Sequence, residues 1–287
     1  MVCDNALQEK CVGSAMVTFE RMLCEPTGVH LARTATAGEL RATWQSGEPA
    51  AAMRWRPAEE ITWRIVTATT STYTKEQMCG LPANMSIGWS DPGYIHTAVF
   101  DPGSAAAEYA VGSVACASDA LGPLWSQAWS VAATAGDTAT VMLVGDMGEA
   151  PRDHPGSSHH WQMPQPTEVV DAMTLRASGS SAAYDAILHI GDLSYATGYT
   201  SIWDSFMRQI EPLAAAHPYL TSPGNHERDS PGTGAFQHGD DSGGECGVPF
   251  NARFIMPAGD AQTKPGPQPG AADPRAPYYS QDVGPMQ

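Results

Sequence analysis

The sequence predicts two consecutive domains, an antiparallel β-sandwich followed by a layered α/β domain. From Val29 to about Val131, short segments of alternating polarity are separated by Gly, Pro and Asp turn residues, which is typical of a sandwich. After residue 137, apolar runs alternate with helix-like segments, and that order predicts a parallel sheet covered by helices. We expect an unassigned segment over residues 1–27, the sandwich over 28–134 and the α/β domain over 137–287.

Four segments of the first part read as strands: "ELRATWQ", "ITWRIVTAT", "IHTAVF" and "AEYAVGSVA". In the first of them, Leu40, Ala42 and Trp44 fall on one face because strand side chains alternate. A turn is expected at Asp101-Pro102-Gly103, because Pro presets φ and Gly accepts a positive φ.

In the second part, strands are predicted at "TATVMLVGD", at residues 186–190 and at "PYLTS". A first helix is expected over 167–178, with Thr167 as N-cap and Gly179 as stop. A second helix is expected over 201–216, with Ser201 and Asp204 as a variant capping box and Pro218 beyond its end. One face of this second helix is apolar and carries Ile202, Phe206, Ile210 and Leu213.

Composition limits the possible partners. The 287 residues are 42% hydrophobic, which is enough for sizeable cores. With 31 acidic against 15 basic residues the formal charge is -16, so we expect no nucleic-acid partner and no attraction to anionic lipid. No run of about 18 apolar residues predicts a membrane span, and no signal peptide is visible at the start of the sequence.

Six cysteines occur without a CxxC spacing, which makes structural zinc improbable. They are Cys3, Cys11, Cys24, Cys79, Cys116 and Cys246. Three of the six lie within the first 24 residues, which suggests disulfides in an oxidising compartment, although buried free thiols explain them equally well. The triplet at Asn84 is an N-glycosylation sequon, a weak pointer in the same direction.

Polar residues follow three predicted strands at the point where each ends: Gly145-Asp146, Gly191-Asp192 and Gly224-Asn225-His226-Glu227. Each Gly-Asp alone is explained by a turn or a cap. The carboxyl ends of parallel strands meet at one edge of a sheet, so the three turns are expected to converge. Carboxylate and amide oxygens suit hard metal ions, and one aspartate can bridge two of them.

The motifs "GDMG", "GDLSYATGY" and "GNHE" resemble the first three motifs of the metallophosphoesterase superfamily in the form that purple acid phosphatases use. Most members have Asp-x-His and Gly-Asp-x-x-Asp. Here Gly148 stands in place of that His and Tyr195 in place of the second Asp, which is the purple acid phosphatase pattern.

The resemblance covers more than these three motifs and includes the first domain. "STYTKEQMCG", "GWSDPGYIHTAVF" and "DSGGECGVP" are similar to stretches of large plant-type purple acid phosphatases. It implies a fibronectin-III-like β-sandwich followed by an incomplete α/β metallophosphoesterase domain with an αββα-type layered sheet.

Ligand roles follow from the resemblance motif by motif. Asp146 and Tyr195 would bind Fe(III), Asp192 would bridge, and Asn225 would bind a divalent metal, either Zn, Mn or Fe. A phenolate adds negative charge and hard oxygen character, which favours a trivalent ion. His226 would be catalytic, close to the substrate phosphate. Glu227 belongs to the same motif, with its role open.

The implied reaction is that of an acid phosphatase, hydrolysis of phosphate monoesters by a metal-bound hydroxide at a dinuclear Fe(III)-M(II) centre. A phosphodiesterase or nucleotide pyrophosphatase on the same scaffold stays open, because the leaving-group pocket decides between the esters. The family resemblance also implies a phosphate ester substrate, a homodimer as one possible assembly, and a secreted or vacuolar location.

The remaining histidines are given no metal role. We expect the loop histidines to be solvated, His189 to be a satisfied structural residue, and the sandwich histidines to have no chemistry. These are His154, His159 and His160 in the loop, and His30 and His96 in the sandwich.

Two later family motifs, Val-x-x-His and Gly-His-x-His, do not occur in this sequence, and only His238 follows Glu227. The chain therefore resembles the front half of an enzyme, with an open metal site and an unpaired sheet edge. It is either a fragment of an active phosphatase or a short product without catalysis that acts as a binding module. The four intact ligand positions favour the first interpretation.

Overall fold

A computed structural model describes residues 24–118, 122–133, 137–150, 165–178, 184–231, 239–257 and 279–284. Several sequence predictions lie outside these ranges and have no structural outcome. They concern the segment up to residue 23, the loop histidines His154, His159 and His160, and His238.

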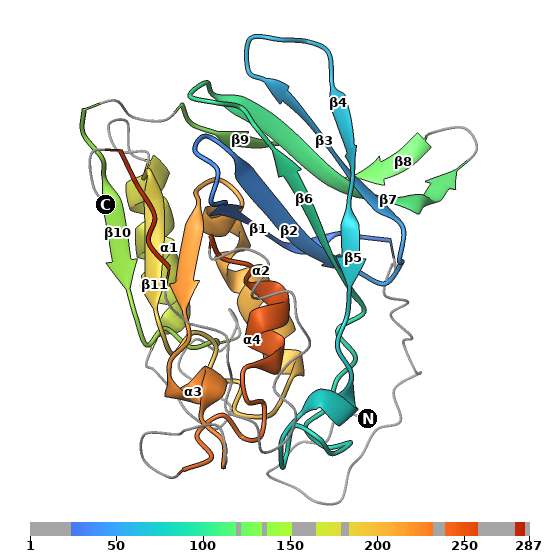
Figure 1. Cartoon of the computed structure of the whole chain (residues 1–287), viewed down its shortest axis with the longest axis vertical. Coiled ribbons are helices and arrows are strands. Elements are labelled where there is room, and N and C mark those ends of the chain that lie inside the picture. Colours follow the sequence, from blue (N-terminus) through green and yellow to red (C-terminus); the bar gives the residue numbers. More distant parts are fainter. Residues whose placement is uncertain are drawn as a thin grey trace, which may run out of the picture.

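The first part of the chain forms two antiparallel sheets (Figure 1). One has the strand order β1-β2-β6-β5, and the other has the order β4-β3-β7-β8 with β9 also paired to β7. The strands are β1 (Thr27–Arg33), β2 (Leu40–Ser46), β3 (Ala51–Pro57), β4 (Arg64–Thr67), β5 (Thr69–Ser71), β6 (Tyr94–Phe100), β7 (Ala107–Ser118), β8 (Gly122–Trp125) and β9 (Trp129–Val131). A single 3-10 turn, η1 (Lys75–Gln77), interrupts the connection between β5 and β6.

Both sheets bury side chains in one apolar core, which includes Trp44, Met53, Phe100 and Tyr109. The face predicted for β2 is confirmed, since Leu40 is buried together with Ala42 and Trp44. The turn at Asp101 is also confirmed, because its Oδ1 accepts the N–H of Gly103 at 2.8 Å and Gly103 has φ +61°.

One predicted strand is wrong in its extent. The segment "ITWRIVTAT" divides into β4 and β5, which belong to different sheets, because β4 pairs with β3 while β5 pairs with β6. The strands β1 and β3 were not predicted at all. β1 carries five consecutive buried residues, so it lacks the alternation that marks a strand with one solvated face.

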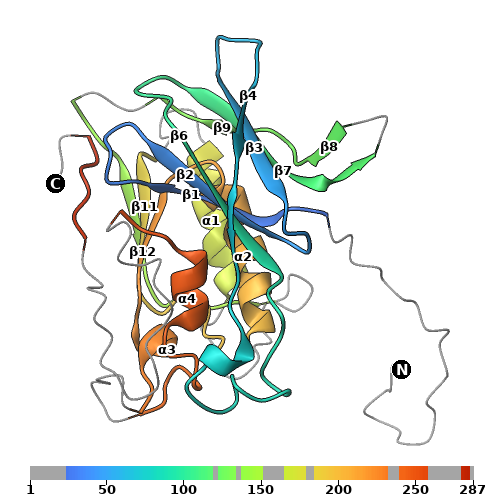
Figure 2. The same cartoon turned by 45° about the vertical axis from the view of Figure 1, so that its right-hand side comes forward.

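The second part contains a parallel sheet of order β10-β11-β12, as predicted. Its strands are β10 (Val141–Val144), β11 (Ala186–Ile190) and β12 (Tyr219–Ser222). Its helices are α1 (Pro166–Ser178), α2 (Ser201–Ala214), α3 (Asn225–Arg228) and α4 (Val248–Arg253), and Figure 2 shows α1 and α2 beside this sheet. None of the described helices is long and apolar enough to cross a membrane.

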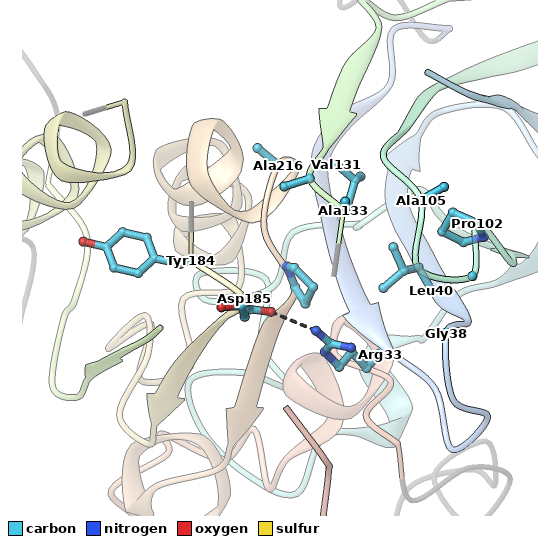
Figure 3. A pocket seen from close by; sticks show the side chains of 13 residues that line it. Arg33, Gly38, Leu40, Pro102, Ala105, Val131, Ala133, Tyr184, Asp185 and Ala216 are labelled. Atoms are coloured by element: carbon cyan, nitrogen blue, oxygen red, sulfur yellow. Dashed lines mark hydrogen bonds between the residues drawn. The ribbon is translucent and has the colours of Figure 1, made fainter. Parts of the chain in front are cut away.

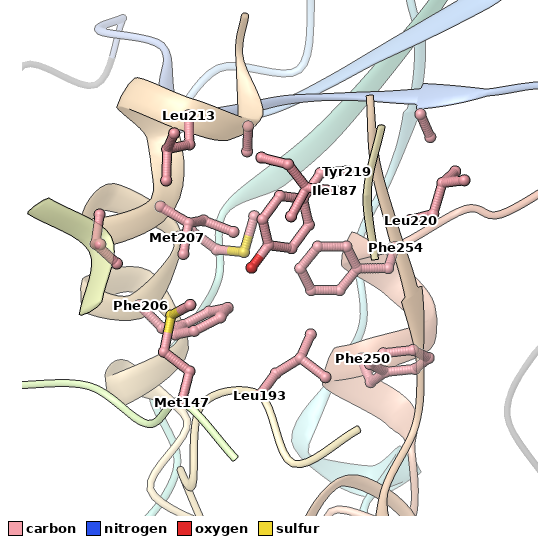
Figure 4. Close-up of a cluster of buried hydrophobic side chains, with 14 of the residues drawn as sticks. Met147, Ile187, Leu193, Phe206, Met207, Leu213, Tyr219, Leu220, Phe250 and Phe254 are labelled. Carbon is pink, nitrogen blue, oxygen red and sulfur yellow. The ribbon is translucent and has the colours of Figure 1, made fainter. Parts of the chain in front are cut away.

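The predicted capping box of α2 is wrong. Thr200, not Ser201, is the N-cap, and no side chain caps the helix there. The apolar face is correct, since Phe206, Ile210 and Leu213 are fully buried. They pack in a core between α2 and the parallel sheet (Figure 4), and this packing fixes the helix without help from a cap.

Arg253, 1% exposed at the end of α4, joins the two parts of the chain. Its Nη2 lies 3.0 Å from Asp204 Oδ1 on α2, and its Nη1 bonds to the hydroxyl of Tyr73 in the β5–β6 connection. The same Asp204 oxygen accepts a hydrogen bond from Gln45 Nε2 of β2 at 3.2 Å. A cation placed here is therefore paired and hydrogen-bonded on several sides, as a buried charge requires.

Arg253→Ala should lower the free energy of unfolding by about 3 to 5 kcal/mol, because it leaves Asp204 without its cation in a buried place. Denaturant unfolding measures the loss. The matched control is Arg64→Ala, since Arg64 and Glu60 form an ion pair whose side chains are 45% and 46% exposed, and its loss should cost about 1 kcal/mol or less. Equal losses in the two variants would contradict a structural role for the buried pair.

Candidate active site

The three strand ends converge, as the sequence predicts. Asp146 follows β10, Asp192 follows β11, and Asn225 starts α3 directly after β12. The Tyr195 hydroxyl donates to Asp146 Oδ1 at 2.8 Å and lies 3.5 Å from Asp192 Oδ2. Oxygen atoms from two different strand ends therefore face one phenol.

Three of these residues have left-handed backbones: φ is +52° at Asp146, +49° at Asp192 and +52° at Tyr195. Six non-glycine residues of the described chain have positive φ, so half of them are predicted ligands. Such a conformation costs about 1–3 kcal/mol per residue and persists only where the surroundings enforce it. Tyr is especially unfavourable there, so the strain points to a site that needs these side chains in these directions.

Glu227 supplies part of that enforcement. Its fully buried carboxylate accepts the N–H groups of Gly224 and Asp192 at 2.9 Å each and of Leu193 at 2.8 Å. The loops after β11 and β12 are thereby joined through one side chain. Burial raises the pKa of Glu227 to about 7, although the three hydrogen bonds act in the opposite direction.

The role left open for Glu227 is thus a structural one at the site. The sequence held a signal for it, because an acidic residue three places after an N-cap is the pattern of a capping box. Gly224 is the N-cap of α3 and Glu227 is the residue at that spacing. The glutamate reaches back to the N-cap N–H, as the pattern requires.

Gly224 leaves room for the Asp192 carboxylate. A Cβ at Gly224 would lie 2.1 Å from Asp192 Oδ1, which no side chain can tolerate. The same oxygen accepts the N–H of His226 at 3.0 Å. One oxygen of Asp192 is therefore engaged by the backbone of the third motif, while Oδ2 faces the Tyr195 hydroxyl.

Asp241 is a neighbour of the site that sequence reasoning missed. Its Oδ2 accepts a hydrogen bond from Asn225 Nδ2 at 3.0 Å, and its backbone carbonyl lies 3.0 Å from His226 Nδ1. The His226 ring packs on the Tyr195 ring with centroids 4.5 Å apart. The only sequence signal for Asp241 was its place in the stretch "DSGGECGVP", which gave no role to any single residue.

Burial raises the pKa of Tyr195 well above its usual value, and the hydrogen bond to Asp146 and the nearby carboxylates add to the shift. The phenol therefore keeps its proton when only protein groups surround it. Within the described residues, no three His, Cys, Asp or Glu side chains form a metal-binding group, because the donors here are two carboxylates, a phenol and an amide. Such an all-oxygen set fits a hard cation, which would take the place of the phenol proton.

A second buried carboxylate, that of Glu245, contacts the second motif. Glu245 accepts the N–H of Gly198 on Oε1 and the indole N–H of Trp203 on Oε2, both at 2.8 Å. Burial raises its pKa to about 8.

Of the other histidines, His30 and His96 lie in the antiparallel sheets, whereas His189 lies inside β11, one residue before the end of that strand. His189 Nδ1 lies 2.7 Å from the Tyr219 hydroxyl, and burial lowers the pKa of His189 to about 4. His30 contacts two backbone carbonyls, and His96 contacts the hydroxyls of Ser46 and Thr70. His30 and His96 therefore have partners on both ring nitrogens. The expectation of a satisfied His189 is correct for Nδ1 but wrong for Nε2, which is buried without a hydrogen-bond partner among the described residues.

A small cavity of about 40 Å³ lies between the two parts of the chain (Figure 3). It is lined by Arg33 and Leu40 from the antiparallel sheets and by Tyr184 and Asp185 before β11. Because these last residues precede the strand, the cavity lies at the opposite edge of the parallel sheet from Asp192. Its volume suits a water molecule or two rather than a substrate.

Comparison with known proteins identifies the class of the second domain. Residues 139–264 match the calcineurin-like phosphoesterase family, so this part of the chain is a calcineurin-like phosphoesterase domain. The match includes all three strand-end motifs.

The relatives are purple acid phosphatases, which confirms the resemblance stated from the motifs. Probable inactive purple acid phosphatase 1 of Arabidopsis thaliana is 37% identical over 233 residues, covering 77% of this chain and 36% of that protein. The structure of purple acid phosphatase PPD1 from yellow lupin (Lupinus luteus) seeds superposes with a TM-score of 0.73 at 36% identity, covering 83% of this chain and 42% of that chain.

A barley (Hordeum vulgare) nucleotide pyrophosphatase/phosphodiesterase is 42% identical over 118 residues, which cover 41% of this chain and 31% of that protein. The chain spans about a third of the length of these curated relatives. Over the part that superposes on the lupin structure, the chain has the two-domain arrangement of a purple acid phosphatase.

Gly224→Ala should displace the Asp192 carboxylate and lower the free energy of unfolding by about 1–3 kcal/mol, because its Cβ has no space. Denaturant unfolding measures this. Gly80→Ala is the control, since a Cβ there meets its nearest atoms at an ordinary 3.5 Å. If both variants unfold alike, Gly224 is not required for close packing against Asp192.

Glu245 also predicts a pH dependence of stability. Its folded-state pKa of about 8 lies above the usual 4.5, so its stabilising contribution is complete below about pH 4.5 and is lost as the pH rises through about 8. The loss amounts to up to about 1.4 kcal/mol per pH unit. Unfolding measured between about pH 5 and about pH 8 should therefore show a shallower decline in Glu245→Gln. If the free energy of unfolding falls as steeply with pH in Glu245→Gln as in the wild-type protein, Glu245 is not the source of the pH dependence.

Proposed function

We propose that the chain carries the metal-binding half of an acid phosphatase site, which hydrolyses phosphate monoesters with Fe(III) and a divalent metal, either Zn, Mn or Fe. The observation that carries the proposal is the convergence of Asp146, Asp192 and Tyr195 oxygens at the ends of two parallel strands. The relation to purple acid phosphatases, whose family uses two metal ions, supports it.

Each side chain has a proposed task. Asp146 and Tyr195 would hold iron, Asp192 would bridge, and Asn225 would hold the divalent ion. Bound there, the ions would supply a nucleophile at acidic pH and neutralise charge on the phosphoryl oxygens. His226, held by its backbone on Asp192 and by its ring on Tyr195, would orient the phosphate or assist the leaving oxygen.

An acidic protein can accept an anionic substrate at such a site, because the positive charge is local. The formal charge of -16 repels phosphate at a distance. Asp146 and Asn225 are exposed while Tyr195 is buried, so the site would be open to an ester on one side and shielded on the other.

Two alternatives have support of their own. The name of the barley relative favours cleavage of a phosphodiester or pyrophosphate bond. The names of several Arabidopsis relatives, which call them probable inactive phosphatases, favour a binding module without catalysis.

The sheets over residues 27–131 are proposed to be the fibronectin-III-like sandwich of the plant-type enzymes, since two antiparallel sheets share one core. A secreted or vacuolar location is proposed as well. It is supported by the disulfide between Cys79 and Cys246, because disulfides persist in oxidising compartments.

The test loads the protein with ferric iron and Zn²⁺ and records its visible absorption and its rate on nitrophenyl phosphate and on the bis-nitrophenyl diester. The proposal expects a ferric-phenolate band and faster cleavage of the monoester. Tyr195→Phe should lose the band because no phenolate remains to bind iron. Tyr184→Phe, at the opposite edge of the sheet, is the control and should keep it.

A Tyr195→Phe variant that keeps the colour would refute the role of this phenol. Faster cleavage of the diester would favour the phosphodiesterase. Bound metal with no turnover of either ester would favour the inactive binding module.

A further inference from the structure

We propose that Asp241 is a positioning residue for the third motif. Its side chain would turn the Asn225 oxygen toward the metal, and its backbone would fix the ring of His226. The inference rests on the proposed function for its purpose, while its geometry is independent of any metal. None of the three strand-end motifs includes Asp241, and the stretch "DSGGECGVP" that begins with it gave it no role.

The amide of Asn225 has two chemically different ends, and Asp241 distinguishes them. An ionised carboxylate only accepts hydrogen bonds, so the atom 3.0 Å from Asp241 Oδ2 must be the nitrogen of Asn225. The oxygen of Asn225 then lies on the other side of its side chain. That oxygen is the atom that a hard cation would bind, and a rotated amide would present its N–H₂ group instead.

His226 is set by the backbone of the same residue. A carbonyl oxygen also only accepts, so the contact of 3.0 Å assigns the proton of the neutral ring to Nδ1. The lone pair then belongs to Nε2, and the ring stacks on Tyr195 with centroids 4.5 Å apart. Asp241 therefore sets the orientation of two neighbouring side chains of the third motif.

The loop that carries Asp241, residues 239–247, is fixed from two directions. On one side, the N–H groups of Cys79 and Gly80 in the β5–β6 connection donate to Gly244 O at 2.8 and 3.3 Å, and Cys79 is bonded to Cys246. On the other side, the N–H of Gly247 donates to the carbonyl of Glu227 in α3 at 2.8 Å. A residue that orients a ligand needs such support, because its own position must be determined.

Two glycines allow this loop to sit so close. A Cβ at Gly243 would lie 2.0 Å from Thr197 O, and one at Gly244 would lie 2.3 Å from the backbone of Gly80. The backbone of this loop therefore packs closely against both the β5–β6 connection and the second motif. Figure 1 shows that connection running from the antiparallel sheets to the end of the molecule that carries α3.

The experiment compares Asp241→Ala and Asp241→Asn with Asp240→Ala as control. Ala removes the acceptor, whereas Asn keeps one acceptor oxygen. Asp240 is an exposed carboxylate in the same loop whose Oδ1 accepts the N–H of Gly244. Asp240→Ala removes one negative charge and one contact within the loop, as Asp241→Ala does. It leaves the hydrogen bond between Asp241 and Asn225 in place.

The first readout uses metal-free protein. Proton–nitrogen correlation NMR should show the side-chain amide of Asn225, assigned by its absence in Asn225→Asp, protected from solvent exchange. Protection should vanish in Asp241→Ala and persist in Asp241→Asn and Asp240→Ala. Protection that persists in Asp241→Ala would overturn the proposal, and the backbone spectrum shows that each variant is folded.

The second readout is Zn²⁺ affinity, measured by competition with a chromogenic chelator. Asp241→Ala should weaken binding by about 10- to 100-fold, the usual effect of removing a partner that orients a metal ligand. Asp241→Asn should restore most of the affinity. Equal weakening in Asp241→Ala and Asp240→Ala would overturn the proposal, because loop integrity would then explain both.

The two readouts separate the inference from the function on which it rests. Wild-type protein that binds no Zn²⁺ would contradict the proposed metal site. The amide signal of Asn225 would still decide whether Asp241 holds that side chain.

Discussion

The carboxylate of Glu227 is the interaction on which the site depends. It accepts three backbone N–H groups from the loops after β11 and β12. Those loops cannot separate without leaving three buried donors and a carboxylate unpaired. The strained backbone of Asp192 is tolerable because one of these bonds holds its N–H, while the Gly224 backbone occupies the space beside its side chain. The strand ends thus form a preorganised group before any ion arrives.

The antiparallel sheets are joined by specific contacts to the part of the chain that carries the strand-end motifs. Arg253 connects Tyr73 in the β5–β6 connection to Asp204 on α2, and the Cys79–Cys246 disulfide connects the same segment to the loop of Asp241. The two parts of the chain therefore meet at the end of the molecule where the motifs lie. A substitution that disrupts the β5–β6 connection would therefore affect the site through these contacts rather than through the apolar core of the sheets.

Much of this could be predicted from the sequence, because strand ends and their polar residues are local patterns. The parallel order of β10, β11 and β12 and the meeting of Asp146 with Tyr195 followed from such patterns. The role of Arg253 did not, because its partners lie 49 and 180 residues away in the sequence. The role of Asp241 did not either, because its partners 15 and 16 residues away lie in another element and no helix or strand periodicity records such a contact. The disulfide stayed undecided for the same reason, since its two cysteines are 167 residues apart.

The central claim is that Asp146, Asp192 and Tyr195 together bind iron. The most direct measurement is X-ray diffraction at the iron absorption edge from crystals of the protein grown with ferric iron. The account predicts an anomalous peak at ligand distance, about 2 Å, from the oxygens of Asp146 and Tyr195. A well-ordered map with no peak at these strand ends, or with iron bound elsewhere, would contradict it.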